Sequence, residues 1–130
     1  MKDHYVIKVA EGAKHDPDYC YILQAIRERT EPRYLREDSE AKQMEGELKY
    51  LRIAETEGGE IITRNNTEVV IPKNFREEIL TMLHAGHRAE AAMLQQSRGR
   101  FWWSGMREAI RTKYKSCEDC LLHAPSKPDP

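Results

Sequence analysis

Two short pairs of metal-binding residue types stand 29 residues apart in this chain of 130 residues. His84 and His87 lie in the tetrapeptide HAGH, and Cys117 and Cys120 lie in CEDC. Each pair is spaced so that one short turn can direct both side chains to a common centre. Zn²⁺ prefers a closed tetrahedral shell of histidine nitrogen and cysteine sulfur. The four residues therefore predict one zinc site, although a CxxC pair also fits a redox-active thiol pair beside two unrelated histidines.

A shell of four protein ligands has a defined chemical role. Two neutral imidazoles and two thiolates balance the charge of Zn²⁺, and they leave no open position for the water or substrate that a catalytic zinc binds. We therefore expect a structural Zn²⁺ whose loss unfolds the surrounding module. His123 is an alternative to one of the four ligands.

The elements that must position these ligands are predicted to be helices. Asn74, with Glu77 three residues later, has the pattern of a capping box and predicts a helix that reaches His84. Gly86 permits the turn that brings His87 back toward His84.

Two further helices are expected between the ligand pairs. One covers residues 89–96, and the other follows Ser104 as its N-cap. The last helix places Met106, Ile110 and Tyr114 on one face, which leads directly into Cys117.

The preceding half of the chain has weaker patterns. Residues 4–10 predict a short strand or an extended arm, and residues 18–29 predict an amphipathic helix in which Cys20 packs as a small apolar residue. Residues 38–52 predict a second helix, despite the interior Gly46. The apolar runs 61–63 and 68–71 flank Arg-Asn-Asn-Thr, which predicts a β-hairpin.

Residues 69–128 resemble the HHCC zinc-binding domain of retroviral integrases and, more closely, of Gypsy-type retrotransposon integrases. The shared features are VIP before a helix, LHxGH at its end, the basic and aromatic run that contains FWWSGM, and CxxC before a Pro/Lys tail. The chain departs from the family where it has Arg88-Ala89 in place of Pro-Gly and Ser104 in place of the proline of WPGM. Neither departure removes a ligand.

The predicted fold is mainly α: a small zinc-stapled three-helix bundle preceded by a β-hairpin and an N-terminal helical extension. The expected divisions are a helical extension (1–60), the hairpin with the HHCC domain (61–123), and a proline-rich linker or tail (124–130). Four apolar residues are expected to fill the core beside the metal, namely Phe101, Trp103, Met106 and Ile110. Stacking of one ring of Phe101-Trp102-Trp103 on a base is the less favoured alternative.

The net charge of −1 conceals an uneven distribution. Residues 1–83 carry 13 basic and 17 acidic side chains, whereas residues 84–130 carry 8 and 5. The zinc module is therefore mildly basic, which fits DNA contact as one part of a larger assembly rather than a dedicated nucleic-acid binder. The candidate nucleic-acid contacts are Arg98, Arg100, Arg107, Arg111, Lys113 and Lys115.

The resemblance implies a non-catalytic module that supports multimerisation and the binding of DNA ends during DNA integration, while a separate downstream core performs strand transfer. We therefore expect no catalysis by this chain alone. The alternatives are a domesticated retroelement-derived protein that acts as a dimerisation module and, less favoured, a sequence-reading zinc finger. The expected partners are a second copy of the chain, DNA, and a downstream integrase core or a host protein. The three cysteines and the lack of an apolar run that could span a membrane favour an intracellular protein, nuclear or cytoplasmic.

Overall fold

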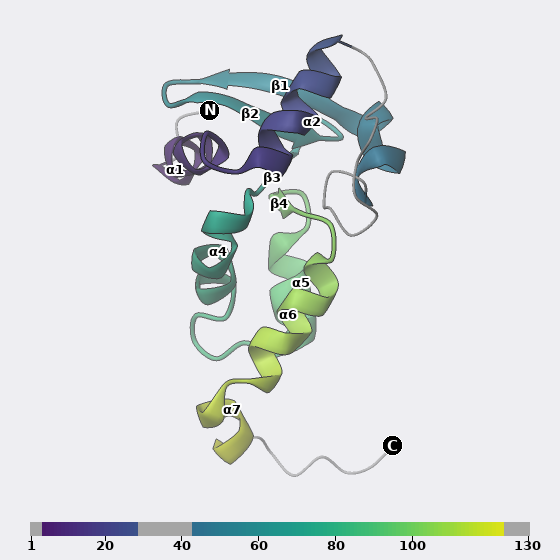
Figure 1. Cartoon of the computed structure of the whole chain (residues 1–130). Coiled ribbons are helices and arrows are strands. Elements are labelled where there is room, and N and C mark those ends of the chain that lie inside the picture. Colours follow the sequence, from purple (N-terminus) through teal and green to yellow (C-terminus); the bar gives the residue numbers. More distant parts are fainter. Residues whose placement is uncertain (1–3, 29–42, 124–130) are drawn as a thin grey trace.

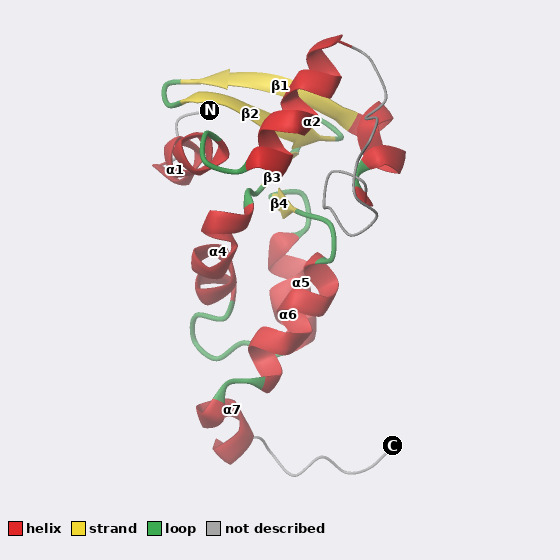
Figure 2. Ribbon diagram, viewed as in Figure 1, coloured by secondary structure: helices red, strands yellow, loops and turns green. Residues whose placement is uncertain are grey.

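The computed structural model describes residues 4–28 and 43–123 of the chain. Its elements are mostly helical, with one small sheet (Figures 1 and 2). Helices α1 and α2 lie at the sheet, α4, α5 and α6 extend from it, and α7 lies at the far end (Figure 1). No helix among the described residues is both long and apolar enough to cross a membrane.

The sheet has four strands in the order β1-β2-β3-β4. The first two pairings are antiparallel, whereas β3 and β4 are parallel, with Val69 opposite Phe101. The strands are β1 (Leu51–Thr56), β2 (Gly59–Arg64), β3 (Glu68–Val70) and β4 (Phe101–Trp102). After β3 the chain leaves the sheet and forms α4 and α5. It returns to the sheet at β4 and then forms α6 and α7.

The predicted hairpin is confirmed as β2 and β3. Asn65 and Asn66 have φ angles of 54° and 64°. Two successive residues with positive φ are typical of the turn whose twist matches that of paired strands, and asparagine tolerates this conformation. Thr63 pairs with Val69 as a result.

The helix predicted over residues 38–52 is wrong for its C-terminal part, and residues 38–42 lie outside the described residues. Glu45–Tyr50 is a 3₁₀ helix, and β1 begins at Leu51. The apolar residues 48 and 51 have helical spacing, but Ile53 does not continue it. In the structure Ile53 lies in β1, opposite Ile62 of β2. Tertiary pairing thus overrides a helical propensity that Gly46 had already weakened.

The short strand or extended arm predicted over residues 4–10 is also wrong, because this segment is part of α1 (His4–Ala13). Val6, Val9, Ala10 and Ala13 are all buried, at the spacing of one helix face. The helix predicted over residues 18–29 is confirmed as α2 (Pro17–Glu28). Cys20 does not pack in the core as expected but is exposed, with its thiol 3.1 Å from the Ala13 carbonyl oxygen.

Helix α4 (Arg76–Leu83) follows a 3₁₀ turn, Lys73–Phe75, and Asn74 does not cap it. The Asn74 amide instead donates a hydrogen bond to the Gly12 carbonyl oxygen at 2.9 Å. The expected helix over residues 89–96 is confirmed as α5 (Glu90–Ser97).

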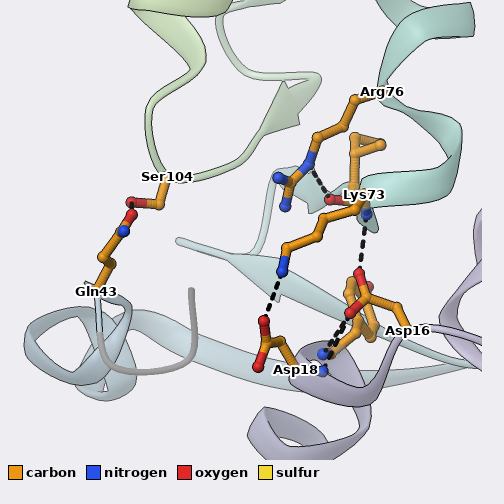
Figure 3. Close-up of polar contacts among 8 residues, drawn as sticks. Asp16, Asp18, Gln43, Lys73, Arg76 and Ser104 are labelled. Atoms are coloured by element: carbon orange, nitrogen blue, oxygen red, sulfur yellow. Dashed lines mark hydrogen bonds and ion pairs between the residues drawn. The ribbon is translucent and has the colours of Figure 1, made fainter. Parts of the chain in front are cut away.

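Helix α6 (Met106–Lys115) is not capped by Ser104 as predicted, because Gly105 occupies the N-cap position with a φ of +85°. The Ser104 hydroxyl is instead 3.2 Å from the Gln43 side-chain oxygen (Figure 3). Helices α4, α5 and α6 contact one another in all three pairings, and α7 (Glu118–His123) packs against α6.

One apolar core connects α1 to these helices. Val6 and Val9 belong to the same buried cluster as Val69, Leu83 and Ile110. The domain boundary between residues 60 and 61 stays a prediction. Residues on both sides of it belong to this one buried cluster, so we expect the stability of the two parts to be coupled.

Asp16 joins the turn between α1 and α2 to the start of the helical half (Figure 3). One carboxylate oxygen accepts hydrogen bonds from the backbone N–H groups of Asp18 and Tyr19, and the other accepts one from Lys73 N at 2.9 Å. The Lys73 ammonium also contacts the Asp18 carboxylate at 2.6 Å. The buried carboxylate of Asp16 is thus satisfied by three donors.

The Tyr19 hydroxyl lies between β2 and β3. It donates a hydrogen bond to the Val70 carbonyl oxygen and accepts one from the Ile62 N–H, both at 2.8 Å. Burial raises the pKa of Tyr19 well above its ordinary value, so the hydroxyl stays protonated and remains a donor.

Replacing Tyr19 with phenylalanine should lower the free energy of unfolding by ~1–3 kcal/mol, because two buried backbone groups lose their partner. Chemical denaturation measures the change. Tyr50→Phe is the matched control, since the Tyr50 ring is 42% exposed and should change stability by less than about 0.5 kcal/mol. Equal effects of the two variants would contradict the bridging role of the Tyr19 hydroxyl.

Deleting residues 1–28 should lower the melting temperature of the remaining chain, because it uncovers apolar residues such as Ile61 and Val69 that α1 helps to bury. Thermal unfolding followed by circular dichroism measures the shift. An unchanged melting temperature would show that the rest of the chain is stable without residues 1–28.

Candidate metal centre

The four predicted ligands come together at the end of the molecule that is farthest from the sheet, beside α7 (Figure 1). His84 follows the last residue of α4, and His87 lies in the loop after it. Cys117 lies between α6 and α7, and Cys120 is in the first turn of α7. The site therefore connects the end of one helix to the end of another.

The ligand atoms are spaced as a zinc ion requires. All four lie within 4.8 Å of one another. Cys117 Sγ is 3.4 Å from His87 Nδ1, Cys120 Sγ is 3.4 Å from His84 Nε2, and Cys120 Sγ is 3.7 Å from His87 Nδ1. Zn–N and Zn–S bonds of ordinary length give tetrahedral edges of about 3.3–3.8 Å. These three separations already fit a tetrahedral zinc ion, and the widest separation in the set, at most 4.8 Å, would close by up to about 1 Å around the metal.

The HAGH turn is held by two residues in the left-handed region. Gly86 has a φ of 76° and His87 a φ of 58°, and the His87 N–H donates a hydrogen bond to the His84 carbonyl oxygen at 2.8 Å. Glycine adopts this conformation freely, whereas a histidine there costs some backbone energy. The turn brings the two imidazole rings to a centroid distance of 5.4 Å.

The His84 ring is oriented by its second nitrogen. Nδ1 is 3.0 Å from the Arg88 carbonyl oxygen, so it carries the proton and leaves Nε2 free for the metal. The ring is buried and lies edge-on to Tyr114, with centroids 6.1 Å apart. The sequence contains no signal for this contact, because the Arg88 carbonyl is a backbone group.

Asp119 supports the other histidine. Its side chain is exposed, and its carboxylate lies 3.7 Å from His87 Nε2, which is an ion-pair distance rather than a hydrogen bond. Asp119 thus places a negative charge near this ring without the hydrogen bond that orients His84. The alternative that His123 replaces one of the four ligands stays a prediction, because the His123 side chain lies outside the described part of the structure.

The two thiols differ before metal binds. Hydrogen bonding, first from the His84 side chain and then from the Cys120 backbone, lowers the pKa of the Cys117 thiol to about 6. Burial raises the pKa of the Cys120 thiol, and the adjacent Cys117 thiolate raises it further. Zn²⁺ binds both as thiolates, so loading the site releases a proton from Cys120.

A closed His₂Cys₂ shell at the ends of two packed helices defines a small domain that is stabilised by a structural zinc ion. Residues 71–126 match the sequence model of the integrase zinc binding domain. This segment therefore matches the integrase zinc-binding family, and it contains a single zinc site formed by His84, His87, Cys117 and Cys120. No curated protein and no solved structure matches the chain.

The candidate nucleic-acid residues occupy different surroundings. Arg111 contacts the carboxylates of Glu90 and Glu108, and Lys113 contacts Glu77 at 2.6 Å. Arg100 lies over the Phe101 ring, with its guanidinium 4.8 Å from the centroid. The other three are exposed side chains without an ion-pair partner among the described residues, namely Arg98, Arg107 and Lys115.

The four residues expected in the core are all at least 94% buried, namely Phe101, Trp103, Met106 and Ile110. They belong to the cluster that also contains Leu83, the residue before His84. Sequence reasoning missed one feature near them: Arg64 of β2 lies over the Trp102 ring at 4.7 Å from its centroid. A side-chain contact between β2 and β4, which are far apart in the sequence and are not paired with each other, has no local sequence signal.

Replacing Cys117 with serine should remove the single bound zinc ion, since serine supplies no thiolate. Elemental analysis of the purified chain measures the zinc content. Cys20→Ser is the matched control, because the exposed Cys20 lies outside the site and its variant should retain full zinc. Equal zinc content in the two variants would contradict the assignment of Cys117 as a ligand.

Chelation should affect the two ends of the molecule unequally. The loop at His87 and helix α7 should lose protection from hydrogen exchange first, because Leu121 and Leu122 of α7 are exposed and contribute little burial. Strands β2 and β3, which lie in the apolar core, should lose less. Uniform loss of protection would instead show that zinc supports the whole fold.

Proposed function

We propose that this chain is the non-catalytic zinc-binding part of a Gypsy-type retrotransposon integrase, and that it supports multimerisation and the binding of DNA ends. The observation that carries the proposal is the closed His₂Cys₂ shell within a segment that matches the integrase zinc-binding family. Such a shell has no vacant coordination position, so the zinc organises a surface instead of activating water or substrate.

The surface beside the metal favours self-association. Leu121 and Leu122, which follow Cys120 directly, are 66% and 76% exposed, and Met82 near the end of α4 is 40% exposed. Apolar side chains exposed on a small helix gain stability when a partner covers them. Because α7 is fixed by Cys120, the metal determines whether these leucines are presented in an ordered way.

The charge of the same half of the chain supports the DNA-binding part of the proposal. Arg98, Arg107 and Lys115 are exposed and free of ion-pair partners within the described part of the chain. Such cations contact phosphates without reading sequence. The second candidate function, a domesticated dimerisation module without DNA binding, is favoured by the acidic first half of the chain.

Sizing and DNA binding together test the proposal. The zinc-loaded chain should self-associate and bind duplex DNA that carries a free end, with an affinity that falls as salt rises. Replacing Leu121 and Leu122 with serine should shift the chain toward monomer, whereas Tyr50→Ser, which removes an exposed side chain elsewhere, should not. A dimer that does not bind DNA would support the domesticated module, and a monomer that does not bind DNA would contradict both functions.

A further inference from the structure

A cleft of about 430 Å³ lies between the hairpin, the end of α5 and the start of α6. Arg64 and Glu68 contribute from β2 and β3, Arg98 from the turn after α5, Trp102 from β4, and Arg107 from α6. Its volume falls in the range of sites for small ligands, about 300–1,000 Å³. The cleft is distinct from the zinc site, since none of the four metal ligands lines it.

Arg64 forms a fixed, flat wall of this cleft. Glu47 accepts hydrogen bonds from its Nε and from one terminal nitrogen, at 3.2 and 2.9 Å, and Glu68 accepts one from the other terminal nitrogen at 2.9 Å. The guanidinium also lies over the Trp102 ring, with its central carbon 4.7 Å from the ring centroid. A guanidinium plane held in this way offers a surface on which a nucleobase can stack.

Arg98 and Arg107 differ from Arg64 because no carboxylate among the described residues neutralises them. Both are exposed and line the same cleft. The carboxylate of Glu68 is engaged by Arg64 and by the backbone N–H of Gly99, so the accessible charge in the cleft is positive. The start of α6, which no side chain caps, faces the cleft through Gly105 and Arg107 and adds to the attraction for an anion.

We propose that this cleft holds one unpaired nucleotide of a single-stranded nucleic acid, with its phosphate bound by Arg98 and Arg107 and its base stacked on the guanidinium of Arg64. The inference rests on the proposed DNA-binding function and narrows it to an unpaired strand, such as a frayed or single-stranded end. A flat stacking surface next to free guanidinium groups suits a nucleotide better than it suits an acidic peptide, which offers charge but no ring.

Fluorescence anisotropy of the zinc-loaded full chain with a short oligo-thymidylate tests the phosphate contacts. The double variant Arg98→Ala/Arg107→Ala should bind about tenfold more weakly, because phosphate contacts dominate the affinity for nucleic acid. The matched control, Lys8→Ala/Lys14→Ala, also removes two exposed cations, one on α1 and one in the turn that follows it, and should change affinity by less than about threefold. Equal affinities of the two double variants would overturn the proposal.

An abasic strand of the same length tests the stacking. It keeps the phosphates but should bind about tenfold more weakly than the thymidylate, as expected when a base loses its stacking partner. Arg64→Lys keeps the charge but removes the planar group, so it should abolish the preference for the intact strand and leave binding of the abasic strand unchanged. A preserved preference in a folded Arg64→Lys variant would overturn the assignment of the base site.

Additional binding measurements distinguish failure of the cleft proposal from failure of the proposed DNA-binding function. Binding to duplex ends without binding to single strands would overturn the cleft proposal and leave the proposed function standing, whereas no binding to any nucleic acid would overturn both. Competition by poly-glutamate as strong as that by the thymidylate would assign the cleft to an acidic protein segment and overturn the proposal. A uridylate strand compared with a deoxyuridylate strand of the same length, which differ only in the 2′-hydroxyl, identifies RNA or DNA as the source of the nucleotide, and either preference supports the cleft.

Discussion

Two imidazoles and two thiolates must meet within tetrahedral distance of one another, and this requirement determines the geometry of the helical half. Helix α4 has to end at His84, the next turn has to place His87 in the left-handed region, and α6 has to deliver Cys117 to the same point. The left-handed histidine and the exposed leucines of α7 are unfavourable in isolation. Metal–ligand bonds, which contribute on the order of 10 kcal/mol in small zinc modules, offset these costs.

The opposite half of the molecule is stabilised by a different force. Around the sheet, burial of apolar side chains dominates, and the polar groups that enter the core are satisfied one by one, as at Asp16 and Tyr19. The two halves share the cluster that runs from Val6 to Ile110. A small domain with a modest core is thus supported at one end by hydrophobic burial and at the other by a metal.

Local patterns in the sequence were sufficient for the metal ligands, for the hairpin at Asn65-Asn66 and for α2, because spacing and turn chemistry are written in adjacent residues. These local patterns gave wrong predictions where the secondary structure depends on contacts with residues far away in the sequence. Residues 4–10 alternate well enough to be read as a strand, yet the sheet buries Val6 and Val9 from one face of a helix. Leu51 has the spacing of a helical residue but lies in β1, because it pairs with Arg64 of β2. The cleft at Arg64 is formed by segments that are far apart in the sequence, so no local pattern predicts it.

The parallel pairing of β3 with β4 affects the order in which the chain can acquire its structure. The hairpins β1-β2 and β2-β3 join neighbouring residues, whereas β4 pairs with β3 only after α4, the histidine turn and α5 have been added. Pairings between distant residues form more slowly, and chains are synthesised from the N-terminus. The two histidines are therefore synthesised well before the two cysteines. All residues of the four strands have been synthesised at a stage when only two of the four metal ligands exist.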